Sequence, residues 1–280
     1  MKIALLQTVS STRVDDNLAA AVALVADAAR AGARLAVLPE YFCVMGRQDT
    51  DKLAVAEADG RGPIQDRLAA LAREHALWLV GGTLPIRDAR DAAADGDRVR
   101  NACCVWSPDG ERVARYDKIH LFRFSEGSES YDEGRTLEAG STPVAFEADG
   151  WRVGLSICYD LRFPELYRAL MRPAPCDLLL VPSAFSVPTG RAHWELLLRA
   201  RAVENQAYVA AAAQGGTHEN GRTTWGHSLV ADPWGTVVAE RAEPGPGVVL
   251  HTLERERIAA VRAKLPALEH RGRTLAPGPA

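Results

Sequence analysis

The chain has 280 residues, of which 47% are hydrophobic and 25% are charged, the composition of an ordinary globular protein. Its 33 basic and 36 acidic residues leave a net charge of −3, which argues against nucleic acid or an anionic membrane as a partner, because both favour a basic face. The first apolar run is too short for a signal peptide, and no run approaches the ~18 residues of a membrane-spanning helix, so a reduced cytoplasm is expected.

Short apolar runs alternate with helix-like segments along the chain. In chain order we predict a strand over 2–7, a helix over 15–32, a strand over 34–40, a helix over 64–76, a strand over 77–83 and a hairpin over 101–118. A strand over 151–158, a helix over 163–171, a strand over 177–183, a helix over 191–206 and a strand over 207–214 follow. A hairpin over 227–240, a strand over 247–253 and a helix over 255–265 complete the pattern.

Strands that alternate with helices indicate an α/β layered fold, and the added hairpins indicate a mixed sheet. We expect a single domain over 1–270, a polar surface loop over 88–98 and a Pro/Gly-rich tail over 271–280. The five cysteines, an odd number without zinc-ligand spacing, argue against a disulfide framework and a zinc site. Cys103 and Cys104 are adjacent and are expected to point to opposite faces of a strand.

Three chemically active residues each end an apolar run. Glu40 follows the LAVLP run, Lys118 follows RYD, and Cys158 follows VGLSI. Because sites in open α/β sheets form beyond the strand ends, the three are candidates for one cluster. A carboxylate can take the thiol proton, and an ammonium can stabilise negative charge on a substrate oxygen. A salt bridge between Glu40 and Lys118 beside an inert core cysteine is the structural alternative.

The local sequences around these residues resemble the nitrilase, or carbon–nitrogen hydrolase, superfamily. LPEYF (38–42), RYDKIHLF (115–122) and GLSICYDLRFPELYR (154–168) each match one of its motifs, and the match continues through 182–214 and 225–240. It covers nearly the whole chain, in the expected order. The resemblance implies a four-layer α-β-β-α sandwich and a Glu–Lys–Cys triad that cleaves small amides without a metal or an organic cofactor.

The same resemblance implies roles for individual residues. It makes Glu40 the general base, Lys118 the oxyanion stabiliser and Cys158 the nucleophile, with the backbone N–H of Tyr159 as a second oxyanion donor. The superfamily usually carries a further glutamate between the Lys and Cys motifs. Glu133 is the best match, and the same loop offers Glu126 and Glu129 as alternatives.

The segments over 183–214 and 226–239 look most like the branch of deaminated-glutathione amidase and omega-amidase. The implied substrate is a small 2-oxo-acid amide: deaminated glutathione, split into 2-oxoglutarate and cysteinylglycine, or 2-oxoglutaramate. Arg162 is our candidate for its carboxylate, because a guanidinium pairs with carboxylate in two places; a salt bridge to Glu165 or Asp160 is the alternative. Further candidates for the substrate site are Arg123, Phe185, Arg191 and His193.

Other functions stay open. The chain is also compatible with another small-amide or N-carbamoyl hydrolase, an acyltransferase, a redox-sensing thiol protein, or a catalytically silent relative that binds a metabolite. Intact Glu40, Lys118 and Cys158 argue against silence, and no resolving cysteine supports redox sensing. The resemblance further implies a homo-oligomer, a dimer or a tetramer, with the helices over 163–171 and 191–206 and the C-terminal segment as candidate contacts.

Overall fold

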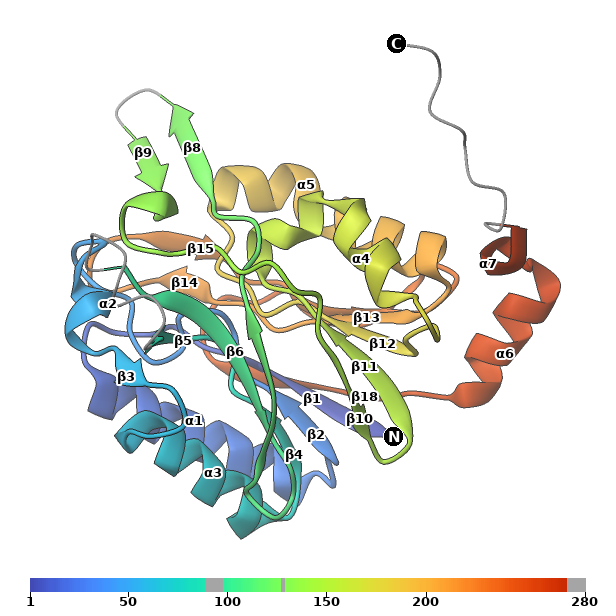
Figure 1. Ribbon diagram of the computed structural model, residues 1–280, viewed down its shortest axis with the longest axis horizontal. Helices are drawn as coiled ribbons and strands as arrows, with labels where there is room; N and C mark the ends of the chain where they lie inside the picture. The colour runs from blue at the N-terminus through green and yellow to red at the C-terminus, as the bar shows by residue number, and fades with distance from the viewer. Residues whose placement is uncertain (89–97, 127–128, 271–280) are drawn as a thin grey trace.

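The first strand shows how the chain builds its layers. In β1 (Lys2–Gln7), Ile3 and Leu5 belong to one core cluster, and Ala4 and Leu6 belong to another. Successive side chains of a strand point to opposite faces of its sheet, so an unbroken apolar run is what a strand buried on both faces requires. In the computed structural model, which describes residues 1–88, 98–126 and 129–270, two sheets stack with helices on both outer faces (Figure 1).

The first sheet has eight strands. Its order is β18 (Gly247–Thr252), β1, β2 (Leu35–Val37), β4 (Trp78–Val80), β6 (Arg100–Trp106), β5 (Leu84–Arg87) and β3 (Glu57–Ala58), with β7 (Arg112–Asp117) paired to β6. On its outer face lie α1 (Val14–Arg30) and α3 (Pro63–His75), whose apolar sides form a core with the sheet. The short α2 (Asp51–Ala54) lies in the connection before β3.

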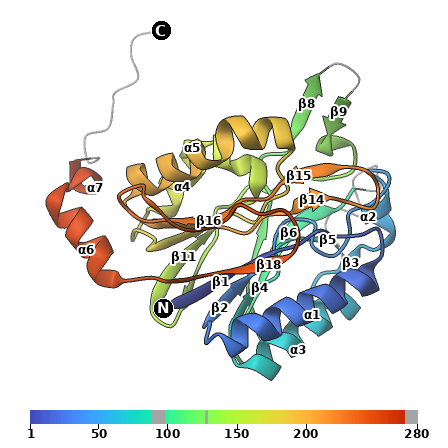
Figure 2. The same cartoon turned by 180° about the vertical axis from the view of Figure 1, so that it is seen from behind.

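The second sheet has six strands and faces the first. Its order is β10 (Ala145–Ala148), β11 (Trp151–Leu155), β12 (Leu178–Leu180), β13 (Tyr208–Ala211), β16 (Ser228–Ala231) and β17 (Val237–Arg241). Its outer face carries α4 (Pro164–Leu170) and α5 (Val187–Asn205). The reverse view shows the same order of layers from behind (Figure 2). The predicted four-layer α-β-β-α sandwich is therefore confirmed.

Smaller elements complete the chain. Two short hairpins, β8 (Arg123–Glu126) with β9 (Glu129–Asp132) and β14 (Gly215–Thr217) with β15 (Thr223–Trp225), project beside the sheets. The 3₁₀ helices η2 (Glu133–Arg135) and η3 (Cys158–Arg162) follow β9 and β11, and α6 (Arg255–Lys264) and α7 (Ala267–His270) end the described chain. Across the residues that the structure describes, no helix has the length and hydropathy to cross a bilayer.

Most predicted elements are confirmed. The hairpins over 101–118 and 227–240 are β6–β7 and β16–β17. Cys103 and Cys104 fall in the inner and outer core clusters respectively, as alternation requires. The helix predicted from residue 191 begins earlier, at Val187, because Pro188 suits the first turn of a helix. Most of the loop predicted over 88–98 and the tail over 271–280 lie outside the described residues.

Several strand predictions were too long, and two of these strands lead into the site. The strands predicted over 34–40 and 151–158 end at Val37 and Leu155. Beyond each end the chain turns sharply, since Tyr41 and Cys158 have φ angles of +56° and +46°. A strand cannot continue through such left-handed residues. The turns carry Glu40 and Cys158 off their sheets and toward each other.

Candidate active site

The site lies where strands of both sheets end. Glu40 follows β2 and Lys118 follows β7, both in the first sheet, while Cys158 opens η3 after β11 of the second. Glu40 and Lys118 are each 1% exposed, and Cys158 is 8% exposed. Glu40 and Cys158 line one cavity, and both Glu40 and Lys118 perturb the pKa of the Cys158 thiol. The structure therefore brings the three predicted residues together.

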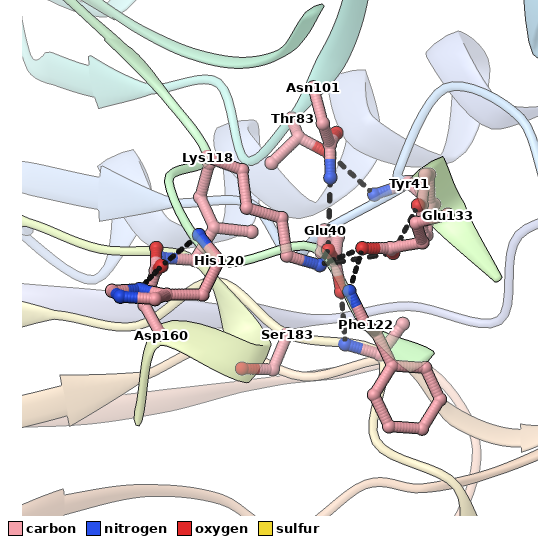
Figure 3. Close-up of polar contacts among 12 residues, drawn as sticks. Glu40, Tyr41, Thr83, Asn101, Lys118, His120, Phe122, Glu133, Asp160 and Ser183 are labelled. Atoms are coloured by element: carbon pink, nitrogen blue, oxygen red, sulfur yellow. Dashed lines mark hydrogen bonds and ion pairs between the residues drawn. The ribbon is translucent and has the colours of Figure 1, made fainter. Parts of the chain in front are cut away.

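Lys118 lies between two carboxylates (Figure 3). Its Nζ donates to Glu40 Oε1 at 2.8 Å, to Glu133 Oε2 at 2.8 Å and to Glu133 Oε1 at 3.0 Å. Burial alone would lower the pKa of Lys118, but the charges of Glu133 and Glu40 outweigh it and raise that pKa above its usual value. The ammonium is thus a fixed positive charge at the floor of the site.

Both oxygens of Glu40 are held in place. Asn101 Nδ2 donates to Oε1 at 3.0 Å, and the backbone N–H of Ala184 donates to Oε2 at 3.1 Å. A carboxylate has about four acceptor positions, so Glu40 keeps capacity for one more proton donor. Its orientation is set by β6 on one side and by the segment after β12 on the other.

Glu133 anchors the other side of Lys118. Tyr41 donates its phenolic O–H to Glu133 Oε1 at 2.7 Å, and the N–H of Phe122 donates to Oε2 at 2.7 Å. Burial would raise the pKa of Glu133, but Lys118 and these donors lower it below its usual value. The predicted second glutamate thus lies in contact with the candidate catalytic lysine. The side chains of the alternatives, Glu126 and Glu129, lie outside the described part of the chain.

Cys158 occupies a strained backbone position at the start of η3. Its φ of +46° is uncommon for a residue other than glycine, and such strain persists only where neighbours impose it. The Cys158 N–H donates to the carbonyl of Pro182 at 3.0 Å. Asp160, fully buried, accepts from the N–H of Ile157 at 2.9 Å and from Tyr116 Oη at 2.7 Å. These contacts hold the thiol at the edge of the cavity.

The surroundings of Cys158 favour the protonated form of its thiol. Burial raises its pKa well above the ordinary value, Glu40 raises it further, and Lys118 opposes them only in part. Attack as a thiolate therefore requires a base. Glu40 is the carboxylate placed to take that proton.

A small cavity, partly open to solvent, lies beside Cys158. Of the predicted substrate residues, Arg162 and Phe185 line it, together with Tyr159, Ser186 and Thr189. The Arg162 guanidinium lies 5.7 Å from the Tyr159 ring centre and 5.5 Å from that of Phe185. None of the ion pairs found in the described ranges involves Arg162, and the alternative salt bridges to Glu165 and Asp160 do not form there.

The other predicted substrate residues lie elsewhere. His193 is exposed and reaches the site only through a 3.2 Å contact of its Nδ1 with Arg162 Nη1. Arg191 is exposed on α5 and does not line the cavity. The Arg123 side chain is 84% exposed, with its Nε 3.9 Å from Asp132. These residues are basic and lie near the motifs in the sequence. Neither property shows whether a side chain points into the cavity or into solvent.

Sequence reasoning missed several residues of the site, Ser186 and Thr189 among them. Asn101 orients Glu40, Tyr41 orients Glu133, and Arg222 lines the cavity from the β14–β15 hairpin. Tyr41 could have been predicted as a site residue, because it directly follows Glu40 in the sequence. Asn101 opens a strand and Arg222 lies in a polar turn, so neither carries a local signal. No cluster of three or more His, Cys, Asp or Glu residues that could hold a metal ion occurs in the ranges described.

Comparison with known proteins agrees with this geometry. The carbon–nitrogen hydrolase family model matches residues 2–263. The deaminated glutathione amidase of Synechocystis is 38% identical over 271 residues, which span 96% of this chain and 97% of that protein. Human omega-amidase NIT2 is 36% identical over 272 residues, 96% of this chain and 94% of the relative.

A solved structure extends the likeness to the fold. The crystal structure of Saccharomyces cerevisiae Nit3, a member of branch 10 of the nitrilase superfamily, superposes with a TM-score of 0.86 at 30% identity and covers 97% of this chain and 96% of its own. The chain belongs to the carbon–nitrogen hydrolase family. Its class is that of an amidase, an enzyme that hydrolyses carbon–nitrogen bonds of small amides.

Proposed function

We propose that this amidase uses Cys158 to hydrolyse deaminated glutathione to 2-oxoglutarate and cysteinylglycine. The observation that carries the proposal is a buried thiol at the wall of a small cavity, beside a carboxylate and a fixed ammonium that are both 1% exposed. The relatives named deaminated glutathione amidase, similar over nearly the full chain, support the choice of substrate.

In the proposed reaction Glu40 takes the proton of Cys158, and the thiolate sulfur attacks the amide carbonyl carbon. Lys118 and the backbone N–H of Tyr159 stabilise the oxyanion. The carbon–nitrogen bond breaks, Glu40 returns its proton to the leaving amine, and a thioester remains. Glu40 then takes a proton from water, whose oxygen attacks the thioester, and the proton goes back to the sulfur as the acid leaves. Glu133 holds Lys118 in position throughout.

The acyl half of this substrate ends in a 2-oxo acid. We propose that Arg162 binds its carboxylate, because the guanidinium lines the cavity and is fixed between the rings of Tyr159 and Phe185. Ser186 and Thr189 line the same wall and offer hydroxyl groups to the oxo and carboxylate oxygens. His193 supports the guanidinium from outside.

Omega-amidase activity on 2-oxoglutaramate is the second candidate. Its acyl half is the same 2-oxo acid, so the wall of Arg162, Ser186 and Thr189 serves both substrates. The relatives named omega-amidase NIT2 support it. The two activities differ in the leaving group, which is ammonia in one and a dipeptide in the other.

We also propose that the chain works in the cytoplasm as a homo-oligomer. All five cysteines are free thiols, as suits a reducing compartment. The outer face of α5 leaves Leu196 66% and Val203 48% exposed, and such apolar surface is typical of subunit contacts. A single species of monomer mass for both the wild type and Leu196→Glu in light scattering would contradict the oligomer.

The test of the activity is the release of 2-oxoglutarate from both substrates, with Cys158→Ala beside the wild type. We expect the wild type to turn over deaminated glutathione about a hundredfold better in kcat/KM, which is about 2.7 kcal/mol in transition-state binding. Cys158→Ala should lose turnover, whereas Cys176→Ala, which changes another buried free thiol away from the cavity, should keep it. Full turnover by Cys158→Ala would refute the mechanism.

A further inference from the structure

A second cavity adjoins the one beside Cys158. It is partly open to solvent and shares Tyr41, Phe122, Glu133 and Arg222 with the first. Four shared lining residues make the two cavities neighbouring compartments of one cleft. The outer compartment is not needed by the chemistry at the thiol, and it has room for a part of the substrate beyond the scissile bond.

Two cationic side chains line this outer compartment, Lys52 and Arg222. Lys52 Nζ lies 3.3 Å from Thr136 Oγ1 and 5.3 Å from the centre of the Tyr41 ring. Arg222 lies over the Tyr131 ring at 5.1 Å, and its buried Nε has no hydrogen-bond partner. In the parts of the chain that the structure describes, neither cation forms an ion pair within 4.0 Å.

The acidic residues of the same lining do not satisfy these cations. Glu133 is committed to Lys118, Tyr41 and Phe122. Asp132 accepts from the N–H of Gly134 at 3.1 Å and faces Arg123, and Asp49 is exposed at the rim.

Burial lowers the pKa of Lys52, and Glu133 and Asp49 compensate only in part. An unpaired, partly buried cation is costly unless an anion accompanies it. The outer compartment therefore favours an anionic ligand group.

We propose that Lys52 and Arg222 bind the terminal carboxylate of the substrate's leaving half, and that this contact selects deaminated glutathione over 2-oxoglutaramate. The inference rests on the proposed function. From the scissile carbonyl to the glycine carboxylate, the cysteinylglycine half spans two residues, which reach at most roughly 7 Å when extended. Because the two compartments share four lining residues, the leaving half can extend from the inner one into the outer one. The ammonia released from 2-oxoglutaramate has no group that could enter the outer compartment.

The test compares Lys52→Met with the wild type on both substrates. Losing a charge-assisted contact to the carboxylate should lower the ratio of kcat/KM for deaminated glutathione to that for 2-oxoglutaramate by about ten- to a hundredfold. The loss should appear in KM, Lys52→Arg should restore much of the ratio, and Arg222→Met should lower it too. Arg123→Met, which removes a neighbouring cation that lines neither compartment, is the matched control and should leave the ratio unchanged.

A modified substrate tests the contact from the ligand's side. Deaminated glutathione with its glycine carboxylate converted to an amide should lose about the same factor with the wild type, and Lys52→Met should add little further loss, because the two changes remove one interaction. The proposal is overturned if Lys52→Met lowers both substrates equally, or if the wild type processes acid and amide alike.

A wild type that cleaves neither substrate would instead sink the proposed function. The subsite is then tested by calorimetry with cysteinylglycine on the chain carrying Cys158→Ala. Binding of cysteinylglycine that disappears when Lys52→Met is added to Cys158→Ala, but persists when Arg123→Met is added instead, upholds the carboxylate site. Absence of binding to Cys158→Ala alone and to both double variants refutes it.

Discussion

Replacing Glu133 by glutamine perturbs the contact that fixes Lys118 without changing the size of the side chain. Each carboxylate oxygen of Glu133 accepts two hydrogen bonds, one from Lys118 and one from either Tyr41 or the N–H of Phe122. A glutamine must place an NH₂ group where one oxygen stood, so that a donor faces the Lys118 ammonium in either orientation. The substitution therefore breaks one of the two contacts with Lys118 as well as removing a charge.

The magnitude follows from the burial. Removing one partner of a buried ion pair typically costs about 3–5 kcal/mol, and because Glu40 still pairs with Lys118 at 2.8 Å we expect the lower end, about 3 kcal/mol. At roughly 2 °C per kcal/mol for a chain of this size, Tm should fall by about 6 °C. A mispositioned oxyanion donor should lower kcat by ~100-fold.

The assay pairs thermal unfolding with steady-state release of 2-oxoglutarate, measured well below the Tm of every variant so that unfolding does not contribute. Glu138→Gln is the matched control, since Glu138 forms an exposed pair with Arg98 worth about 1 kcal/mol or less. If Glu133→Gln keeps kcat within about threefold of the wild type and keeps its Tm, then Glu133 does not position Lys118.

Three further outcomes are expected. Asn101→Leu, which removes the 3.0 Å hydrogen bond to Glu40, should lower kcat by about tenfold or more; an unchanged kcat in steady-state assays would show that Glu40 needs no orientation. Arg162→Met should raise KM for both 2-oxo-acid amides by about ten- to a hundredfold, whereas Arg191→Met should change it less than about twofold, and equal effects would contradict the assignment. The folded-state pKa of Glu133 is lowered from its ordinary 4.5, so its contribution to stability is present above that pH and is lost as pH falls through the lower folded value. Urea unfolding at about pH 6 and pH 3.5 should show a smaller acid loss in Glu133→Gln than in the wild type, and identical losses would exclude this source.

Periodicity and motifs predicted the layers well, because the signals are local. The run KIALLQ indicated a buried strand, and the patterns over 15–32 and 64–76 indicated helices, the first with Gly32 as its stop. The short strands β3, β5 and β10 escaped prediction. Each has two to four residues and pairs with partners far along the chain or across a turn, so its conformation is set by tertiary contacts.

The residues of the site likewise fall into those that local sequence predicted and those that only tertiary contacts place there. Spacing from strand ends, supported by the family resemblance, identified Glu40, Lys118 and Cys158. Arg222 lies far along the chain from Glu40 and Cys158, in the β14–β15 hairpin that follows β13. Only the tertiary fold brings it to the cavity, whose lining also includes residues that follow β2 and β11. Of the three arginines predicted to bind substrate, only Arg162 lines the cavity, whereas Arg123 and Arg191 are exposed. The difference depends on which face of an element meets the cavity. A single sequence gives that only for amphipathic segments, and α5 is polar near its start.

The division of the site between two sheets has a consequence for biosynthesis. Glu40, Lys118 and Glu133 all emerge from the ribosome before Cys158, and the N–H that holds Glu40 belongs to Ala184, later still. A nascent or truncated chain that ends before the second sheet contains Glu40, Lys118 and Glu133 but lacks Cys158. On the proposed mechanism such a chain cannot form a thioester, and we expect newly made protein to be inert toward cellular amides until both sheets have docked. Turnover then reports completed folding, and two inactive fragments split between Gly140 and Trp151 offer a complementation reporter for it.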